Sequence, residues 1–401
     1  MSRAAVVASS VRPARGRLDL LAFPLFEVIP ACERHLSRVP LGEFPTAVES
    51  LEPVARELGV GGADAWVKRD DISSRAYGGN KVRTLELLFG EARALGCTRV
   101  VSTGAFGSNH ALATAIHAPR VGLEAGALLF PQPVSWAALT NLRALTMTGA
   151  QLHGLPHWGA LPFGMAWLRL ASEQAPYVMA PGGATPLGAL GYASAALELG
   201  RQIAAHELPL PRRVIVGVGS TCTSAGLLLG FALAAHFRVG FEPATLPRLT
   251  SVRVSPWPVT SRLRILRLAT RAARLLHELS AGAAPLFESS TLGARFEVDG
   301  GFLGPGYGQP SASGNEAQAL WRRLGLPALD STYSAKVAAR VVAALRARET
   351  GPVLFWSTKS SVPMPSPDSL KTKEDRSASV PPRIRAWLFR AERVLANEPA
   401  P

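Results

Sequence analysis

Cysteine, long apolar runs and aromatic residues are all scarce in this chain of 401 residues. The three cysteines, Cys32, Cys97 and Cys222, are odd in number and far apart, which disfavours a disulfide framework and favours a reducing cytoplasm. No apolar run reaches the ~18 residues that a membrane helix needs. The basic N-terminus also lacks the continuous apolar segment of a secretory signal. We therefore expect a cytoplasmic protein with no membrane partner.

Metal-ligand patterns are missing as well. No two cysteines form a Cys-x-x-Cys pair, and His153 and His157 are separated by Gly154 and Pro156, which prevents them from sharing a helix face. We expect no metal site.

Acidic residues are the minority among the charged residues. The chain has 43 Lys and Arg against 29 Asp and Glu, which gives a net charge of +14. Nucleic-acid-binding proteins share this excess. However, the densest basic stretch, residues 248–274, has the spacing of a solvated helix face and few aromatic residues for base stacking. We expect no nucleic-acid partner and only a general attraction for anionic ligands.

The apolar fraction of 47% is enough for a sizeable core, and the length is typical of two domains. Short β-like runs alternate with longer helical patterns. The expected strands are residues 100–103, 127–130, 177–180, 214–218, 249–254 and 353–356, and the expected helices are 109–118, 136–148, 188–206, from 223, 262–279 and 334–348. This alternation predicts an α/β fold with open, mostly parallel sheets flanked by helices. Ligands of such folds bind at the carboxyl ends of the strands.

Lys81 begins an amphipathic helix directly after the turn Gly78-Gly79-Asn80. The dipole at a helix N-terminus disfavours a cation and lowers the pKa of an ammonium group there. A neutral amine is what attack on an aldehyde requires. From this segment alone, a first-turn lysine that reaches solvent is the alternative.

Two loops follow expected strands and offer groups for an anionic ligand. Ser108 and Asn109 stand where a strand turns into a helix, as an N-cap or as groups that move a proton and bind a phenolate oxygen. Residues 217–226 form a Gly/Ser/Thr loop before a helix, which suits a single phosphate or is only a capped turn. Cys222 replaces the third glycine of a dinucleotide fingerprint, and no P-loop lysine follows.

Several further short motifs occur in one order along residues 65–340. They are Lys68-Arg69-Asp70-Asp71, Gly78-Gly79-Asn80-Lys81-Val82-Arg83, Gly107-Ser108-Asn109-His110, Pro181-Gly182-Gly183, the loop at 217–226, Gly306-Tyr307-Gly308 and Tyr333-Ser334-Ala335-Lys336. In this order the sequence resembles the fold type II pyridoxal-phosphate enzymes, which share the fold of the tryptophan synthase β-subunit. The resemblance is to the branch of D-cysteine desulfhydrase and 1-aminocyclopropane-1-carboxylate deaminase.

The resemblance implies a role for each matching position. Lys81 would bind pyridoxal 5'-phosphate covalently and act in catalysis, and Asn109 would bind the phenolic oxygen of the cofactor. Ser334 would face its pyridine nitrogen. Further cofactor contacts are implied for Asn80, Gly219, Ser220, Thr221, Cys222 and Thr223, and substrate contacts for Ser108, Tyr307 and Tyr333. A homodimer is also implied.

The sequence departs from the family pattern in three places. Thr221 and Cys222 replace small loop residues, and residues 356–360 read Trp-Ser-Thr-Lys-Ser where relatives carry a His-Thr-Gly-Gly segment. Ser334 stands where the deaminases carry glutamate. A neutral hydroxyl at this position supports less electron withdrawal than a carboxylate, which favours elimination.

The expected activity is β-elimination from a small amino acid to a 2-keto acid and ammonia, as in a D-cysteine desulfhydrase. The alternatives are ring-opening deamination of 1-aminocyclopropane-1-carboxylate and a degenerate relative that binds the cofactor without catalysis. The expected domains are residues 1–85 with 200–362, which bind the cofactor, and residues 86–199. Residues 363–401 are expected to be a Pro-rich linker and tail, so that removal of residues 371–401 leaves the fold intact.

Overall fold

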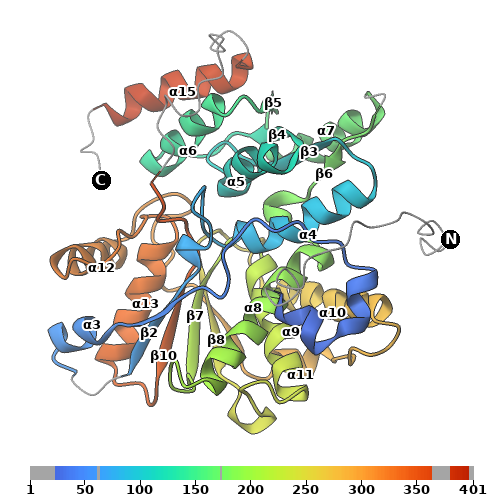
Figure 1. Ribbon diagram of the computed structural model, residues 1–401. Helices are drawn as coiled ribbons and strands as arrows, with labels where there is room; N and C mark the ends of the chain where they lie inside the picture. The colour runs from blue at the N-terminus through green and yellow to red at the C-terminus, as the bar shows by residue number, and fades with distance from the viewer. Residues whose placement is uncertain (1–22, 61–63, 172–173, 364–379, 397–401) are drawn as a thin grey trace.

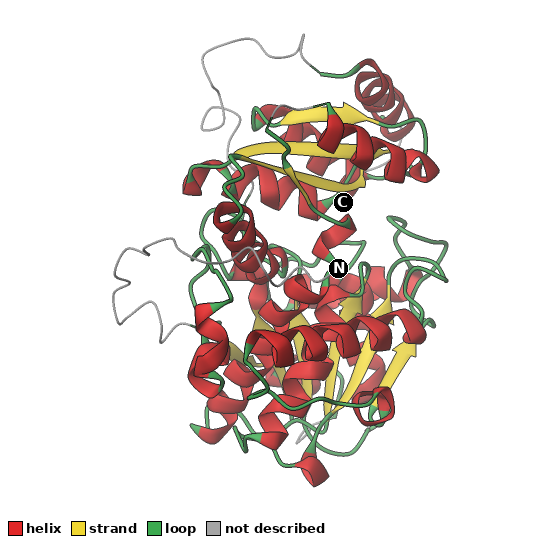
Figure 2. Cartoon of the chain, turned by 90° about the vertical axis from the view of Figure 1, so that its right-hand side faces the viewer, coloured by secondary structure: helices red, strands yellow, loops and turns green. Residues whose placement is uncertain are grey.

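The computed structural model describes residues 23–60, 64–171, 174–363 and 380–396. These residues form two layered α/β units, each built around its own sheet (Figure 1). The two sheets lie in separate layers with helices around both (Figure 2). The expected α/β class with two mostly parallel sheets is confirmed.

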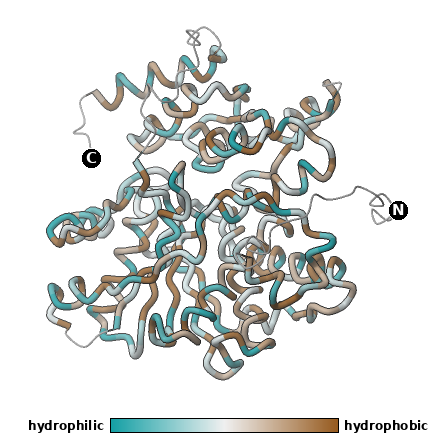
Figure 3. Tube along the Cα trace, viewed as in Figure 1, coloured by the Kyte–Doolittle hydropathy of each residue, from teal (hydrophilic) through white to brown (hydrophobic). Residues whose placement is uncertain are grey.

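The larger sheet has six strands in the order β1-β2-β10-β7-β8-β9. Only β1 runs antiparallel to its neighbour. The strands are β1 (Val48–Ser50), β2 (Ala65–Arg69), β7 (Arg213–Val218), β8 (Arg248–Arg253), β9 (Phe296–Asp299) and β10 (Val353–Ser357). The two central strands, β7 and β10, are near-continuous apolar runs because both of their faces are covered (Figure 3).

Alternate residues of each inner strand enter two different cores. Val214 and Val216 pack with helices α8 (Pro186–Ala204), α9 (Cys222–His236) and α10 (Arg262–Leu279). Ile215 and Phe355 pack on the opposite face with α12 (Ala312–Arg323) and α13 (Ser334–Arg346). The shorter helices of this unit are α2 (Pro24–Val28), α3 (Glu52–Glu57) and α11 (Ser289–Gly293).

The smaller sheet has four parallel strands in the order β5-β4-β3-β6. They are β3 (Arg99–Ala105), β4 (Glu124–Phe130), β5 (Gln151–Gly154) and β6 (Tyr177–Val178). Helices α4 (Lys81–Ala94), α5 (Asn109–His117), α6 (Trp136–Met147) and α15 (Pro382–Leu395) share one core, and α7 (Leu161–Leu170) covers the other face. Short 3-10 turns occur at Pro30–Arg34, Asp70–Ile72, Pro119–Val121, Trp158–Ala160, Pro181–Gly183 and Pro243–Thr245.

Two helices differ from the expected organisation. Residues of α8, which the sequence placed in the smaller domain, pack in the core of the large sheet. Helix α15, expected in a dispensable tail, buries Ile384, Trp387 and Leu395 in the core of the small unit. The sequence did not indicate this docking, because the proline-rich segment before α15 says nothing about where the helix after it packs. That residues 371–401 can be removed without loss of the fold stays a prediction. The domain boundaries between the two units remain a prediction.

No helix within the described ranges is both long enough and apolar enough to span a membrane.

Candidate active site

A cavity with a volume of about 520 Å³ is lined by residues from both units. Its wall includes Ala105 at the end of β3, Phe130 at the end of β4 and Val218 at the end of β7. It is the carboxyl edge of each sheet that faces the cavity, as the α/β pattern predicted. The volume is in the range of small-molecule sites.

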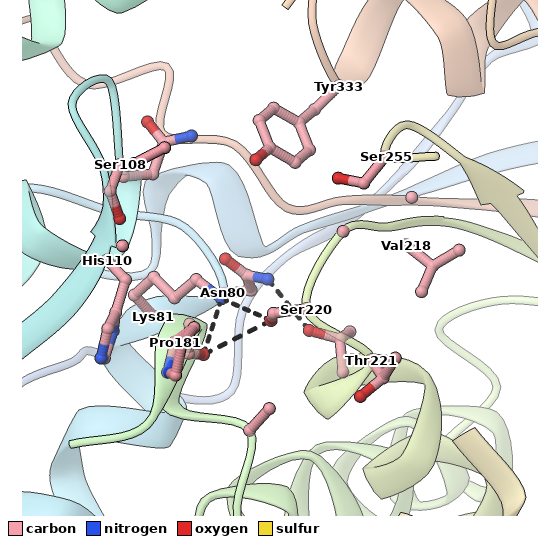
Figure 4. Close-up of a pocket in the computed structure, with 18 of the residues that line it drawn as sticks. Asn80, Lys81, Ser108, His110, Pro181, Val218, Ser220, Thr221, Ser255 and Tyr333 are labelled. Carbon is pink, nitrogen blue, oxygen red and sulfur yellow. Dashed lines mark hydrogen bonds between the residues drawn. The ribbon is translucent and has the colours of Figure 1, made fainter. Parts of the chain in front are cut away.

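Lys81 is a buried amine on the cavity wall, with only 9% of the residue exposed. Its Nζ donates to the Gly182 carbonyl at 3.1 Å and to Ser220 Oγ at 3.4 Å (Figure 4). Burial lowers the pKa of Lys81, because the charged form loses its hydration there. Burial therefore favours the neutral form of this amine, which is the form that attacks an aldehyde.

The turn before Lys81 has little freedom. A Cβ on Gly78 would lie 2.2 Å from the Asp71 carbonyl oxygen, so only glycine fits. Gly79 has a φ of +95°, a conformation that favours glycine. The Asn80 side chain donates to Thr223 Oγ1 at 2.9 Å, which ties the turn to the loop at the start of α9.

The loop before α9 forms the cradle that the sequence predicted for a phosphate. Ser220, Thr221 and Thr223 line the cavity beside the free amide groups at the start of this helix. A Cβ on Gly219 would lie 3.2 Å from the Tyr333 ring and would fill part of this space. Cys222 differs from the expectation, since its Sγ is turned away and lies 3.3 Å from the Gly183 carbonyl oxygen.

Asn109 and Ser108 stand at the start of α5 on the opposite wall. Asn109 Oδ1 accepts hydrogen bonds from Tyr77 OH at 3.2 Å and Asn141 Nδ2 at 2.8 Å. This arrangement orients the Asn109 amide so that its NH₂ group is the donor available to a ligand oxygen. Ser108 Oγ accepts from the Ala111 amide at 3.2 Å, so the predicted N-cap is present. Ser108 also lines the cavity, which leaves both of its roles open.

Tyr307 and Tyr333 meet on the cavity wall with their hydroxyl oxygens 3.1 Å apart. Burial raises the pKa of both phenols, so each stays protonated at neutral pH. They are neutral hydrogen-bonding groups.

Ser334 is not among the residues that line the main cavity. Its hydroxyl donates to Asp330 Oδ1 at 2.7 Å and faces a second, smaller cavity. The expected contact with the pyridine nitrogen is therefore not supported, because the capping carboxylate of Asp330 holds this hydroxyl. Thr358 and Ser360, which follow β10, are hydroxyl residues that do line the main cavity.

Several cavity residues were not assigned to the site from the sequence. Tyr77, His110, Gln132 and Lys359 are among them. His110 is buried with both ring nitrogens lacking a hydrogen-bond partner, and burial together with nearby Lys81 lowers its pKa to about 3. Tyr77 precedes the turn before Lys81, and Lys359 follows the last strand. These positions were the sequence signal that could have placed both residues at the site.

A group such as pyridoxal phosphate fits the residues that are present. The wall provides a neutral amine, an amide donor and a hydroxyl-rich loop for an anion, and its described residues include no Asp or Glu. Within the described ranges no cluster of three or more potential ligands could hold a metal ion.

Comparison with known proteins agrees with this chemistry. The sequence model of the family described as pyridoxal-phosphate dependent enzyme matches residues 39–285. A nocardicin C-9' epimerase of Nocardia uniformis is 32% identical over 334 residues, which cover 81% of this chain and 93% of that protein. A D-cysteine desulfhydrase of Salmonella typhimurium is 32% identical over 345 residues, with 81% and 95% covered.

Solved structures share the fold. The crystal structure of a homologue of ACC deaminase superposes with a TM-score of 0.67 at 24% identity, covering 84% of this chain and 95% of that one. A threonine deaminase of Solanum lycopersicum gives a TM-score of 0.51 at 15% identity, with 86% and 88% covered.

Proposed function

The chain belongs to the family of pyridoxal-phosphate dependent enzymes, and on this premise we propose that it catalyses β-elimination from a small amino acid. The products would be a 2-keto acid, ammonia and the protonated β-substituent. The observation that carries the proposal is the buried amine of Lys81, which lies between the loop before α9 and the start of α5. The relative named D-cysteine desulfhydrase supports the same reaction.

The residues present suit the parts of a pyridoxal-phosphate site. Lys81 would hold the cofactor covalently, the loop from Gly219 to Thr223 would bind its phosphate, and Asn109 would donate to its phenolic oxygen. The cofactor supplies the electron withdrawal that makes the Cα proton acidic. Thr358, in place of Ser334, would donate to the pyridine nitrogen.

The protein's own groups would bind the substrate and move its proton. The amides at the start of α5 suit the carboxylate of an amino acid. Lys81, whose neutral form burial favours, would take the Cα proton, and Ser108, which lines the same cavity, would relay it. Tyr307 and Tyr333 would position the substrate as neutral donors.

Lys81→Ala tests the proposal directly. The wild-type protein should carry a visible cofactor absorbance band, and borohydride should attach the cofactor to the peptide that contains Lys81. The variant should lose this attachment and keto-acid release from D- and L-cysteine by about 10²–10⁴-fold or more, the size of an acid–base contribution. Attachment to Lys68 or Lys336 would overturn the assignment of the amine.

Two other reactions share the same early proton removal. Epimerisation is a second candidate because a relative at 32% identity is named an epimerase. It would return the opposite enantiomer with no keto acid. Ring opening of 1-aminocyclopropane-1-carboxylate would give 2-oxobutyrate, whereas elimination from cysteine gives pyruvate. A cofactor band with none of these products would identify a protein that only binds the cofactor.

We also propose that the protein is a cytoplasmic homodimer. The three free cysteines, Cys32, Cys97 and Cys222, support a reducing compartment. Light scattering during gel filtration would measure the oligomeric state, and a monomer would overturn this part of the proposal.

A further inference from the structure

A second lysine lines the cavity besides Lys81. Lys359 follows β10, and its segment is held against the turn before Lys81. A β-bridge joins Lys359 to Gly79, and the Asn80 amide donates to the Thr358 carbonyl at 2.8 Å. The turn that positions Lys81 therefore also positions Lys359.

The bonded partner of the Lys359 side chain is a neutral group. Its Nζ donates to Tyr77 OH at 3.0 Å and lies 5.3 Å from the centre of the Tyr77 ring. Tyr77 in turn donates to Asn109 Oδ1 at 3.2 Å, which links Lys359 to the start of α5. Among the described residues, no carboxylate oxygen lies within 4.0 Å of Lys359 Nζ.

Asp330 is the acidic residue whose charge acts on Lys359, and its carboxylate already accepts other hydrogen bonds. Asp330 accepts hydrogen bonds from the amides of Thr332, Tyr333 and Ser334 at the start of α13. Burial opposes the charge on Lys359, but Tyr77 and Asp330 outweigh it and raise the pKa of this lysine. Lys359 is therefore a cation on a cavity wall whose described residues include no acidic side chain.

The requirements of the proposed reaction leave this cation without an anion to bind. The loop before α9 suits the phosphate of the cofactor, and the amides of α5 suit the substrate carboxylate. The Lys359 side chain is hydrogen-bonded to Tyr77, which is bonded to Asn109, so Lys359 belongs to the α5 side of the cavity. The loop before α9 is bonded elsewhere, since its Ser220 lies within hydrogen-bonding distance of Lys81. Lys359 would therefore pair with a third anionic group, besides the cofactor phosphate and the substrate carboxylate.

We propose that Lys359 binds an anionic substituent on Cβ of the substrate. The preferred substrates would then be small amino acids whose β-substituent is an oxyanion ester, such as a sulfate or phosphate. The inference rests on the proposed β-elimination and specifies its substrate class. The Cα proton passes to a base, the substituent leaves with the electron pair of the Cβ–O bond, and water converts the resulting 2-aminoacrylate to pyruvate and ammonia. A fixed cation beside the leaving oxygen stabilises the charge that grows on it.

Paired substrates test this assignment. Both enantiomers of serine O-sulfate and of β-chloroalanine would be assayed for pyruvate release by the holoenzyme. The wild type should prefer serine O-sulfate. Lys359→Gln should lower kcat/KM for serine O-sulfate by about 10–100-fold and for β-chloroalanine by less than about 3-fold, as expected for loss of one charge-assisted hydrogen bond. Lys359→Arg keeps the charge and should retain the preference.

Arg274→Gln is the matched control. This arginine is exposed on α10 and does not line the cavity, so its replacement removes the same unit of charge from elsewhere. It should leave the preference unchanged. If Lys359→Gln lowers kcat/KM equally for both substrates, Lys359 binds the carboxylate that they share. If kcat/KM is unchanged for both, Lys359 contacts neither the carboxylate nor the β-substituent. A wild type that prefers β-chloroalanine, or a Lys359→Arg variant without the preference, would also overturn the proposal.

Binding of an unreactive analogue separates this inference from the proposed function. 2-Amino-3-phosphonopropionate carries a phosphonate on Cβ that is a poor leaving group, and its binding can be followed through the absorbance of the bound cofactor. Wild type should bind one enantiomer of this analogue at least about 10-fold more tightly than alanine, and Lys359→Gln should lose this difference. If no amino acid yields pyruvate, β-elimination is wrong, while this titration still decides whether Lys359 selects an anion.

Discussion

Asp70, Arg83 and Glu198 form a buried ion-pair network behind the residues that line the cavity. Arg83 Nη2 donates to Asp70 Oδ1 at 2.8 Å and to Glu198 Oε1 at 2.9 Å. Lys68 Nζ completes the network with a bond of 2.6 Å to Glu198. Because every charge is paired, burial does not leave an isolated ion. The motif that begins at Lys68 therefore contributes by holding α4 and α8 together, which fixes Lys81 at the start of α4.

The two hydroxyls near the large sheet have different roles in this structure, and paired variants test them. Ser334→Ala removes a bond to Asp330 and should cost about 0.5–1.5 kcal/mol of unfolding free energy while the cofactor spectrum stays unchanged. Thr358→Val should shift the absorbance of the bound cofactor and slow pyruvate release, because Thr358 lines the main cavity.

Absorbance of the holoenzyme and urea unfolding are the two measurements for this pair. A spectrum changed by Ser334→Ala and unchanged by Thr358→Val would restore Ser334 as the partner of the pyridine nitrogen.

At the scale of elements, helix α15 is a structural part of the small unit. Trp387 packs edge-on against Phe106, with ring centres 5.7 Å apart, and its Nε1 donates to the Gln132 carbonyl at 2.9 Å. Gln132 lines the cavity and accepts a bond from the Gly107 amide. Helix α15 thus supports the loop that precedes Ser108 and Asn109.

Trp387→Ala should destabilise the protein by about 3–5 kcal/mol, the usual cost of emptying a buried aromatic site. Removal of residues 380–401 should have at least this effect and weaken cofactor binding through Gln132. Thermal unfolding with and without cofactor measures both. Phe389→Ala is the control, since Phe389 is 62% exposed on the same helix. Wild-type stability after the truncation would show that α15 is dispensable, as the sequence analysis expected.

Most elements were predictable, since each expected strand lies within about two residues of an observed strand. Apolar runs of this length have few other interpretations in an α/β chain. Helices α7 and α12 and strand β5 were missed because their patterns are short or mixed. The docking of α15 depends on tertiary contacts that local patterns do not contain. The bond between Ser334 and Asp330 joins residues four positions apart, so the local capping pattern before α13 was a signal that the sequence analysis did not use.

The candidate site was predictable to the same extent. Lys81, Asn109 and the loop before α9 line one cavity, because the carboxyl edges of the two sheets face the same space. The contact between Lys359 and Tyr77 joins residues 282 positions apart, and no sequence period reports such a pair.

At the scale of the whole molecule, the net charge of +14 has a consequence for ligand capture. A positive field attracts anions toward the protein and raises their association rate. The field reaches about 30 Å at 0.01 M salt and only about 8 Å at 0.15 M, so added salt weakens the attraction. The cavity adds Lys359 and Arg264 to its own wall, which directs this attraction toward the site.

Capture of the cofactor by the cofactor-free protein should therefore depend on salt. The association rate of pyridoxal phosphate should fall several-fold between 0.01 M and about 0.15 M salt, whereas that of pyridoxal, which lacks the phosphate, should change little. Stopped-flow absorbance measures both rates. An equal fall for the two compounds would mean that salt acts on the amine or on the fold. A fall confined to pyridoxal phosphate would show that the excess of basic residues attracts small anions to the protein.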